Sequence, residues 1–308
     1  MPDNFPTVGA IDGCDFAGTI IAIGAAVTQD FQIGDRVCGA VHGSDPANHL
    51  SGSFAEYVCA TADILLKIPD GVSWEEGAAV GGVSLGTLGL AFWDFLGIPF
   101  DCENPANKTN SLPVLVYGGG TATGTMAIQI LKTCGLRPIA VCSTQSFALV
   151  KSYGAEIAFD YSAPDCAAKI RSYTQNNLKY ALDIITNKSS MDFCYSAIGR
   201  RGGKYTGLEL LPDHSGMRRL VTPNWVMGIS IFGKELKLSG GYERPSNPGH
   251  RVLGKKWFQS AQRLWNEGLI RPHPVKVCPG SFTEILEGIN MLREGKVRGK
   301  KLVYRLRE

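Results

Sequence analysis

From residue 113 onward, short apolar runs alternate regularly with segments of helical period, and this alternation constrains the fold more than any other feature. The strand-like runs are VLVYG, PIAVCS, IAFDY, YALDIIT and GKYTGLEL, and the intervening helical ones are TMAIQILKTCG, FALVKSYGA, PDCAAKIRSYT and MDFCYSAIG. Strands that alternate with helices form a parallel sheet with helices on both faces. We therefore predict an α/β fold with a doubly wound parallel sheet.

The first third of the chain has a different pattern. Short apolar runs, CDFAGTIIAIG, GDRVCGAV, GSFAEYVCA and DILLKIP, are separated by Gly and Asp turns, as in the strands of a small β-rich unit. The next stretch opens with Ser73 and Glu76 at capping-box spacing and continues at helical period to residue 98. It predicts one long buried helix that links two domains.

The length of 308 residues, 44% of them hydrophobic, is enough for two domains that share one cleft. We expect residues 1–95 to form the β-rich domain with the linking helix, and residues 96–272 to form the nucleotide-binding domain. The chain then returns to the first domain over residues 273–308, where FTEILEGINMLREGK predicts a helix and KKLVYRL a closing strand.

Composition excludes several classes of function. A net charge of +3 with no stripe of Lys and Arg does not suit a nucleic-acid partner. The nine cysteines form no Cys-x-x-Cys pair and most lie in apolar runs, which indicates reduced thiols and a reducing compartment. The N-terminus lacks the regions of a signal peptide, and we identify no stretch long and apolar enough to span a bilayer. A cytoplasmic location is expected.

The segment LVYGGGTATG has the shape of a nucleotide-binding turn. A Gly-rich turn between the first strand of such a sheet and its first helix lets backbone N–H groups approach a pyrophosphate at the positive end of the helix dipole. Gly118 and Gly120 suit the tight turn and the close approach. Thr123 stands where the G-x-G-x-x-G spacing has its third glycine, so the match is incomplete.

The end of the second strand indicates which dinucleotide is bound. NAD-binding folds usually present an acidic side chain there to the ribose 2′-hydroxyl. This chain instead has Val141-Cys142-Ser143-Thr144-Gln145-Ser146, with Tyr161 after the following strand. Hydroxyl groups and backbone amides can bind a 2′-phosphate, although the same serines also suit ordinary helix capping. We therefore expect NADPH rather than NADH.

Several motifs then carry a resemblance to a known family. The segments GAIDGCDFAGTIIAIG, GGVSLGTLGLAF, GGGTATG, FDYSAPD, IGRRGGKYTGLE and VRGKKLVYRL occur in the order typical of medium-chain dehydrogenase/reductases. More narrowly, the chain resembles the fungal trans-acting enoyl reductases that serve highly reducing polyketide synthases. The resemblance implies a Rossmann-type sheet with a partial GroES-like catalytic domain. It also implies hydride transfer from NADPH to the β-carbon of an α,β-unsaturated polyketide thioester held on a partner synthase.

The resemblance also implies site residues. Its cofactor contacts lie in the Gly-rich turn, after the second and third strands, and in two later segments. They are Gly118, Gly120, Thr121, Ala122, Thr123, Ser143, Thr144, Gln145, Ser146, Tyr161, Leu208, Glu209, Arg298 and Gly299. Gln145 replaces a basic residue often found in that place, which weakens the case for a 2′-phosphate. The substrate contacts fall in two apolar segments. They are Thr87, Leu88, Gly89, Leu90, Ala91, Phe92, Trp93 and Asp94, and Ile229, Ser230, Ile231, Phe232 and Gly233.

Thr87 is the catalytic candidate in this set. Its hydroxyl would hydrogen-bond the substrate or the nicotinamide, with a helix-packing hydroxyl bonded to the preceding turn as the alternative. If the two apolar segments form opposite walls of a channel, a bulky residue at Gly89 or Gly233 should obstruct a polyketide chain and leave NADPH affinity almost unchanged.

A catalytic metal is not expected. Zinc-dependent members of the superfamily place a His-Glu pair where this chain has Cys14-Asp15, and they carry a four-cysteine lobe that has no counterpart here. A catalytic zinc needs three protein ligands around an open position. Cys14, Cys38 and His42 are the residues from which a cluster could be imagined, but buried free thiols and a surface His are far commoner.

The resemblance leaves alternatives open, because the family has further strands before the segment that begins at residue 8. Either the chain is a shortened form of a working reductase or it is a nonreductive homologue that binds polyketide or synthase. A free-standing quinone or alkenal reductase is the other alternative. The expected partner is a polyketide synthase, or a hybrid with a peptide synthetase, that presents a carrier-bound chain. The protein itself is expected to be a monomer without nucleic-acid or membrane partners.

Overall fold

A computed structural model describes residues 7–214, 216–280 and 282–306. The chain separates into two compact units. Unit 1 consists of the residues up to Gly86 and those from Gly228 on, and unit 2 is Thr87–Met227. The expected domain limits at residues 95 and 272 stay a prediction, because compactness alone does not define a functional domain.

Unit 2 contains a parallel sheet of six strands. They are β4 (Pro113–Tyr117), β5 (Arg137–Cys142), β6 (Ile157–Asp160), β7 (Tyr180–Asp183), β8 (Gly203–Gly207) and β9 (Val221–Trp225). The strand order is β6-β5-β4-β7-β8-β9, and every neighbouring pair is parallel. The chain therefore runs outward from β4 in one direction and from β7 in the other. This confirms the predicted doubly wound α/β fold.

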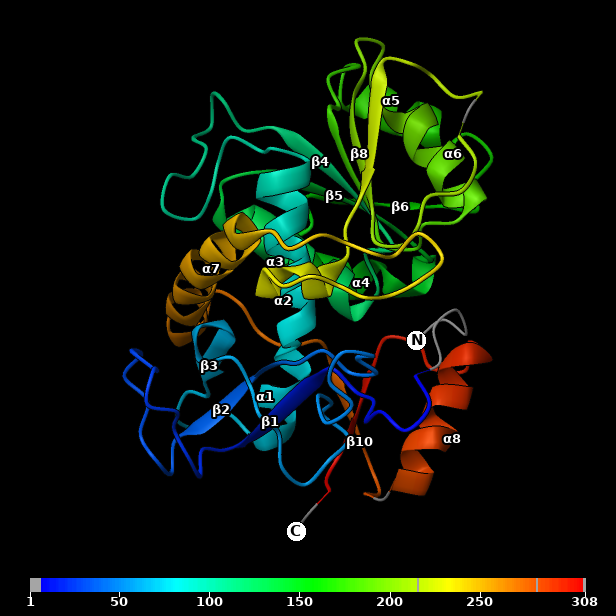
Figure 1. Cartoon of the computed structure of the whole chain (residues 1–308). Coiled ribbons are helices and arrows are strands. Elements are labelled where there is room, and N and C mark those ends of the chain that lie inside the picture. The colour runs from blue at the N-terminus through cyan, green and yellow to red at the C-terminus, as the bar shows by residue number, and fades with distance from the viewer. Residues whose placement is uncertain (1–6, 215, 281, 307–308) are drawn as a thin grey trace. The chain divides into compact units, whose positions relative to one another are not determined.

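Helices connect these strands and cover the sheet (Figure 1). They are α3 (Ala122–Thr133), α4 (Phe147–Ser152), α5 (Cys166–Tyr173) and α6 (Lys188–Ala197), with a short 3₁₀ turn η3 (Thr144–Ser146) before α4. α5 and α6 pack against one face, where Leu115, Ile139 and Val141 form a core with Ile170 and Met191. Because both faces are covered, the central strands are apolar throughout, as parallel strands usually are.

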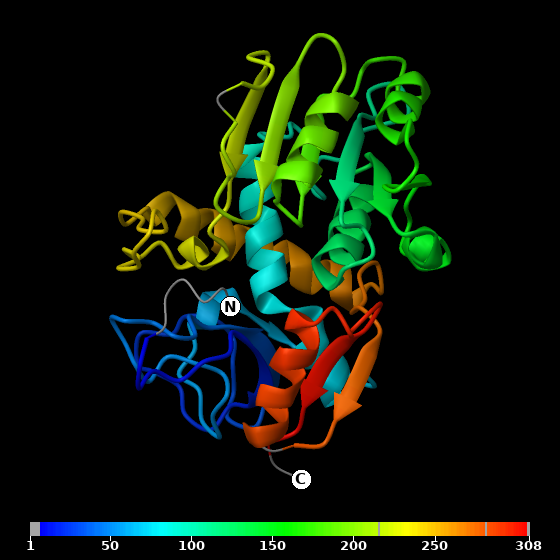
Figure 2. The ribbon, with the colours of Figure 1, turned by 90° about the vertical axis from the view of Figure 1, so that its right-hand side faces the viewer.

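Unit 1 contains two small sheets. Its antiparallel sheet has β1 (Asp15–Thr19), β2 (Arg36–Ala40) and β3 (Leu65–Lys67), the last preceded by η1 (Ala62–Ile64). β10 (Val275–Cys278) and β11 (Lys301–Tyr304) pair in parallel, and α8 (Phe282–Arg293) lies against them (Figure 2). The unit also contains η4 (Gly228–Phe232) and α7 (Pro248–Asn266), which contact each other.

The expected long helix is three consecutive pieces. They are α1 (Trp74–Val80), α2 (Gly82–Gly89) and a π-helical turn η2 (Leu90–Phe95). The predicted capping box is present, since Ser73 and Glu76 exchange side-chain-to-backbone hydrogen bonds. Gly81 interrupts the helix at a φ of 76°, and an added Cβ at Gly82 would lie 2.3 Å from the Gly39 carbonyl carbon. The helix breaks there because its backbone must turn and then pack directly on β2.

The same helical segment corrects one expectation. Trp74–Phe95 is long and apolar enough to cross a bilayer, although we had expected no such stretch. However, 67% of its most apolar window is buried inside the protein, so it is a core helix. Two other differences concern strands. GSFAEYVCA forms no strand, and β9 arises from the irregular segment VTPNW, whose Pro223 and polar residues hid it.

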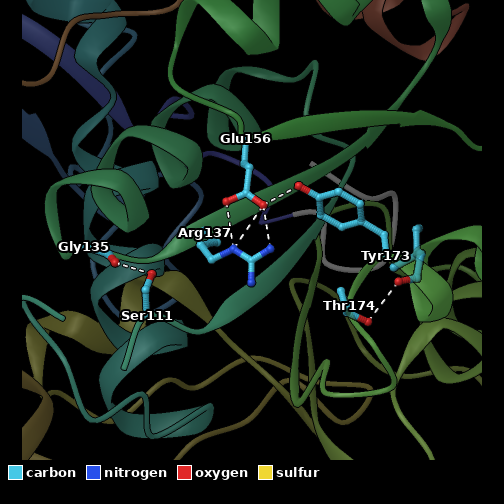
Figure 3. A network of polar contacts seen from close by, with 7 residues as sticks. Ser111, Gly135, Arg137, Glu156, Tyr173 and Thr174 are labelled. Atoms are coloured by element: carbon cyan, nitrogen blue, oxygen red, sulfur yellow. Dashed lines mark hydrogen bonds and ion pairs between the residues drawn. The ribbon is translucent and has the colours of Figure 1, made fainter. Parts of the chain in front are cut away.

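The edge of the six-stranded sheet where the strands begin carries a polar network (Figure 3). Arg137 at the start of β5 shares its single Nε–H between the two carboxylate oxygens of Glu156, and its Nη2 donates to Glu156 Oε1 at 2.8 Å. The Tyr173 hydroxyl donates to Glu156 Oε1 at 2.5 Å, and the Arg137 guanidinium lies over the Tyr173 ring. This network joins β5, the start of β6 and the end of α5.

Candidate nucleotide-binding site

The opposite edge of the sheet, where the strands end, has a topological switch point between β4 and β7. In doubly wound sheets, ligands bind in the crevice outside the carboxyl ends of the strands at such a point. The segment after β4 is the Gly-rich turn, and the segment after β7 is Ile184-Ile185-Thr186. Unit 2 therefore offers one candidate site that topology and motif indicate independently.

The Gly-rich turn has the geometry of a phosphate-binding loop. Gly118 has a φ of 83°, which favours glycine, and the Gly118 and Gly119 amides donate to Val141 O at the end of β5. Thr121 caps α3 by accepting from Gly124 N at 3.0 Å. Ala122 and Thr123 therefore begin a twelve-residue helix whose positive end faces this edge of the sheet, which suits an anionic group.

The third glycine of the motif is Gly124. An added Cβ at Gly124 would lie 2.4 Å from Gly118 O, so only glycine allows α3 to pack this closely on the turn. We had looked for this role at Thr123, one residue too early. Gly118, Gly120 and Gly124 are spaced one residue wider than the G-x-G-x-x-G pattern, so the pattern placed the third position at Thr123.

The predicted ribose-phosphate segment lies directly beside the turn. An added Cβ at Gly120 would lie 2.7 Å from Ser146 Oγ, so only glycine allows the turn to lie this close to the serine. The Ser143 and Ser146 hydroxyls lie 3.4 Å apart, and neither serine makes the expected side-chain cap to a helix. Thr144 and Gln145 are exposed. These polar groups therefore lie beside the Gly-rich turn.

Tyr161 and an acidic neighbour lie next to that segment. The Tyr161 side chain is half exposed, and its ring lies 6.3 Å from that of Tyr117. Asp160 pairs with Cys142 across β5 and β6, and the Asp160 carboxylate accepts a hydrogen bond from Ser162 N at 3.0 Å. Burial, and to a smaller extent the charge of Asp160, raises the pKa of the Cys142 thiol to about 11. Sequence reasoning considered only the end of the second strand and missed this acid on its neighbour.

Leu208 and Glu209 follow β8 at the same edge. The Leu208 amide donates to Thr186 Oγ1 at 2.8 Å, and Glu209 Oε1 accepts from Leu210 N. Both residues are partly exposed. The structure of unit 2 thus brings the Gly-rich turn, Ser143–Ser146, Tyr161 and the β8 loop to one edge. Arg298 and Gly299 belong to unit 1, where Gly299 has a φ of 59°.

The predicted substrate segments are mostly buried. Leu88, Leu90, Ala91 and Phe92 are at most 1% exposed, whereas Asp94 reaches solvent. Thr87 is 6% exposed, and its hydroxyl makes no hydrogen bond to any residue that the structure describes. In unit 1, Ile229, Ser230 and Ile231 are buried, and Phe232 and Gly233 are half-buried. A channel wall formed by these segments stays a prediction.

Gly233 is a poor position at which to test such a channel. It has a φ of 71°, and an added Cβ would lie 2.8 Å from Arg251 Cβ and 3.1 Å from Asn247 O. Any side chain there would strain the backbone and displace the start of α7. A bulky substitution would therefore damage unit 1 itself.

The residues considered for zinc do not fit the metal. The Asp15 carboxylate pairs with Lys301 Nζ at 2.6 Å and accepts from Val83 N at the start of α2. Burial raises the pKa of the Cys14 thiol to about 12 and that of Cys38 still further, whereas zinc binds thiolates. His42 Nδ1 lies 3.4 Å from Asp45 Oδ2. Among the described residues, no three His, Cys, Asp or Glu side chains converge.

Comparison with known proteins agrees with this geometry. The family model described as an alcohol dehydrogenase GroES-like domain matches residues 2–70, and the one described as a zinc-binding dehydrogenase matches residues 122–221. The trans-enoyl reductase ccsC of Aspergillus clavatus is 50% identical over 306 residues, covering 98% of this chain and 84% of that protein. This chain belongs to the trans-enoyl reductase family. Its members are medium-chain dehydrogenase/reductases that act as oxidoreductases with a nicotinamide cofactor.

Further relatives and solved structures agree on the family and the fold. The trans-enoyl reductases ffsC of Aspergillus flavipes and pyiC of Pyricularia grisea are 46% and 45% identical over 99% of this chain, and this chain covers 84% and 82% of them. The crystal structure of the CurK enoyl reductase superposes with a TM-score of 0.72 over 96% of this chain and 80% of that one, at 18% identity. The fold is thus that of the family, with a GroES-like sheet in unit 1.

A nicotinamide dinucleotide fits the residues of unit 2. The glycines of the turn let its backbone pack closely on the neighbouring segments, and the start of α3 supplies N–H groups that suit a pyrophosphate. Ser143, Ser146 and Tyr161 carry hydroxyl groups, which suit a ribose and its substituent. The zinc named in the matched family description has no comparable set of ligands among the described residues.

Proposed function

We propose that this chain is an NADPH-dependent trans-enoyl reductase that reduces α,β-unsaturated polyketide thioesters presented by a partner synthase in the cytoplasm. The relatives' printed names support the enoyl reductase activity. The single observation that supports the phosphorylated dinucleotide is the hydroxyl-lined segment Ser143–Ser146 after β5, in the place where an acid would select NADH.

The binding edge of unit 2 would hold the dinucleotide. The first turn of α3 and the turn glycines would bind the pyrophosphate, and Ser143, Ser146 and Tyr161 would bind the 2′-phosphate. When bound, reduced nicotinamide supplies the hydride that adds to the β-carbon of an enoyl thioester. Leu208, Glu209, Arg298 and Gly299 complete the proposed contacts.

Thr87 is the proposed catalytic residue. Thr87 is only 6% exposed and no hydrogen bond within the described chain engages its hydroxyl, so it can donate to a substrate carbonyl without breaking an existing bond. Such a bond would strengthen as negative charge develops on the thioester oxygen after hydride addition, which is how oriented donors lower a barrier. The apolar residues Leu88–Trp93 that follow it in the chain would exclude water around the substrate.

The partner is proposed to be a polyketide synthase, or a hybrid with a peptide synthetase, that delivers the substrate on a carrier domain. The protein is expected to act as a monomer. Once the carrier domain has bound to the reductase, the substrate attached to it reaches the site at a high effective concentration. A carrier-bound thioester should therefore react faster than the same enone free in solution.

The test follows NADPH oxidation with a crotonyl group on a carrier protein and on a small pantetheine thioester. Wild type is compared with Thr87→Val, which removes the hydroxyl at nearly constant volume, and with Thr87→Ser, which keeps it. We expect Thr87→Val to lower kcat on the carrier-bound thioester by about 100- to 1000-fold, the effect of one lost oxyanion donor. Thr87→Ser should retain most of the activity.

A matched control is Thr206→Val in β8. Thr206 is fully buried, and its Oγ1 also has no partner within the described chain, so this change removes a hydroxyl from a residue outside the proposed substrate segments. In wild type, equal turnover of the carrier-bound thioester and the free enone would favour a free-standing quinone or alkenal reductase. No NADPH oxidation with either substrate would support the nonreductive alternative.

A further inference from the structure

Asp183 ends β7 at the switch point and is completely buried. Its Oδ1 accepts hydrogen bonds from Ile185 N and Thr186 N, both at 3.0 Å. Its Oδ2 accepts from Ser190 Oγ at 2.6 Å and from Tyr205 Oη at 2.8 Å. One carboxylate therefore joins the turn after β7, the first turn of α6 and the core of β8.

The turn that Asp183 holds contains a strained residue. Thr186 has a φ of 51°, a region that β-branched residues rarely adopt. Its hydroxyl donates to Asp183 O at 2.8 Å and accepts from Leu208 N at 2.8 Å. The glycine at 207 makes room for it, since an added Cβ there would lie 2.6 Å from Thr186 Cγ2. Strain of this kind persists only where the surroundings fix it, and it gathers at functional sites.

The same turn lies against the Gly-rich turn. Ile184 N donates to Tyr117 O at 3.1 Å, which ties the end of β7 to the end of β4. An added Cβ at Gly118 would lie 3.2 Å from Ile184 Cβ and 3.2 Å from Ile185 Cγ1. Ile185 is 44% exposed although it is apolar, so it faces the open side of this edge. The strained turn thus separates the Gly-rich turn from the loop that carries Leu208.

We propose that Asp183 and Thr186 are positioning residues for the dinucleotide. Asp183 holds Thr186 in its left-handed conformation, and Thr186 in turn fixes the Leu208 amide and the spacing between the β4 and β8 loops. Neither residue needs to touch the dinucleotide. This inference rests on the proposed binding of the dinucleotide at this edge, and it adds two residues that no sequence motif identified.

The experiment uses two substitutions that differ by one hydroxyl. Thr186→Ser and Thr186→Ala both remove the β-branch and share the same backbone strain, but only serine can accept from Leu208 N. We expect Thr186→Ala to raise the Kd for NADPH about tenfold, in line with loss of one buried hydrogen bond. Thr186→Ser should bind NADPH within about twofold of wild type. Kd is measured by fluorescence titration, and Tm is measured on the same samples.

A purely structural role would give a different pattern. In that case Tm would fall in Thr186→Ala while the Kd for NADPH stayed equal to that of Thr186→Ser, and the proposal would be overturned. Thr206→Val removes a buried hydroxyl one residue before Gly207, and it should change neither quantity. Asp183→Asn provides the second readout, since it should weaken NADPH binding in a protein that still unfolds cooperatively. Unchanged NADPH affinity in a folded Asp183→Asn protein would also contradict the proposal.

The two proposals can fail separately. A wild-type protein that binds NADPH but oxidises none with an enoyl thioester contradicts the proposed activity and leaves the positioning role intact. If wild type binds neither NADPH nor NADH, both proposals are wrong. If wild type reduces the thioester and the Thr186 variants bind NADPH equally, only the positioning role is wrong.

Discussion

Two carboxylates join loops and strands at opposite edges of the same parallel sheet, and their surroundings differ. Asp183, where β7 ends, is fully buried and accepts four hydrogen bonds from neutral donors. Glu156, where β6 begins, pairs with the Arg137 guanidinium at the surface and accepts from the Tyr173 hydroxyl. Burial raises the pKa of Asp183, whereas hydrogen bonds from Arg137 hold the pKa of Glu156 below its ordinary range.

The different surroundings of Asp183 and Glu156 indicate different roles for the two edges of the sheet. A fully buried carboxylate without a cation is costly, because desolvation is compensated only by oriented dipoles. The fold retains it at the switch point, beside a strained turn and the Gly-rich loop. The exposed ion pair at the other edge costs little and stabilises little, since water screens it. We infer that the carboxyl edge is shaped for binding and that the amino edge only joins neighbouring strands.

The largest expected effect comes from removing Asp183. Asp183→Ala leaves two amides and two hydroxyls without their acceptor inside the protein, and each unsatisfied buried group costs about 1–3 kcal/mol. We expect the free energy of unfolding to fall by about 3 kcal/mol or more. Glu156→Ala should lower it by about 1 kcal/mol or less, because both partners of Glu156 can turn to water. Urea denaturation of the two variants measures both values.

Equal losses of stability in Asp183→Ala and Glu156→Ala would contradict the proposed difference between the two edges. Equal losses would mean that the four hydrogen bonds to Asp183 are replaced by water after substitution, and the carboxyl edge would then be as open as the amino edge. The m-value should be checked in the same experiment, since a changed slope would indicate a change in the unfolded or native ensemble.

The sequence predicted the sheet better than the site. Short apolar runs and the 3.6-residue helical period are local features, so they indicated the parallel sheet and its helices correctly. The break at Gly81 and the correct register of Gly124 depend on backbone contacts with Gly39 and Gly118, which no local pattern shows. Asp183 was overlooked for the same reason. Its partners Ser190 and Tyr205 lie 7 and 22 residues away in the chain, and only the folded sheet brings them together.

The next effect concerns Asp160, the acid that sequence reasoning missed at the carboxyl edge. Its carboxylate lies on β6 opposite Cys142, next to the proposed 2′-phosphate segment. A like charge there should oppose a phosphate, so Asp160→Asn should lower the Kd for NADPH about three- to tenfold and leave that for NADH nearly unchanged. Isothermal calorimetry with both dinucleotides measures the ratio. An equal change in both Kd values would show that Asp160 acts through folding alone.

A smaller effect is the pH dependence of the stability that Glu156 contributes at the amino edge. The folded pKa of Glu156 is lowered from its ordinary value of 4.5, so its stabilisation is present above pH 4.5 and is lost as pH falls through the folded pKa. The difference in unfolding free energy between wild type and Glu156→Gln should therefore be about 0.5 kcal/mol near neutral pH and shrink toward zero in acid. Denaturation at a series of pH values measures this difference. A constant difference would indicate that packing, rather than the ion pair, accounts for the loss.

The smallest expected effect is that of Tyr173→Phe. The Tyr173 hydroxyl donates to Glu156 Oε1, but Arg137 already holds both carboxylate oxygens, and the ring itself remains under the guanidinium. Glu156 is partly exposed, so water can take the place of the lost donor. We expect the free energy of unfolding to change by less than about 0.5 kcal/mol. Tyr205→Phe is the matched change at the other edge, because Tyr205 donates to Asp183 in the same way but is fully buried. It should cost about 1 kcal/mol or more, since the vacated position at Asp183 is closed to solvent. If the two tyrosine variants lost the same stability, burial would not be the property that distinguishes the two edges.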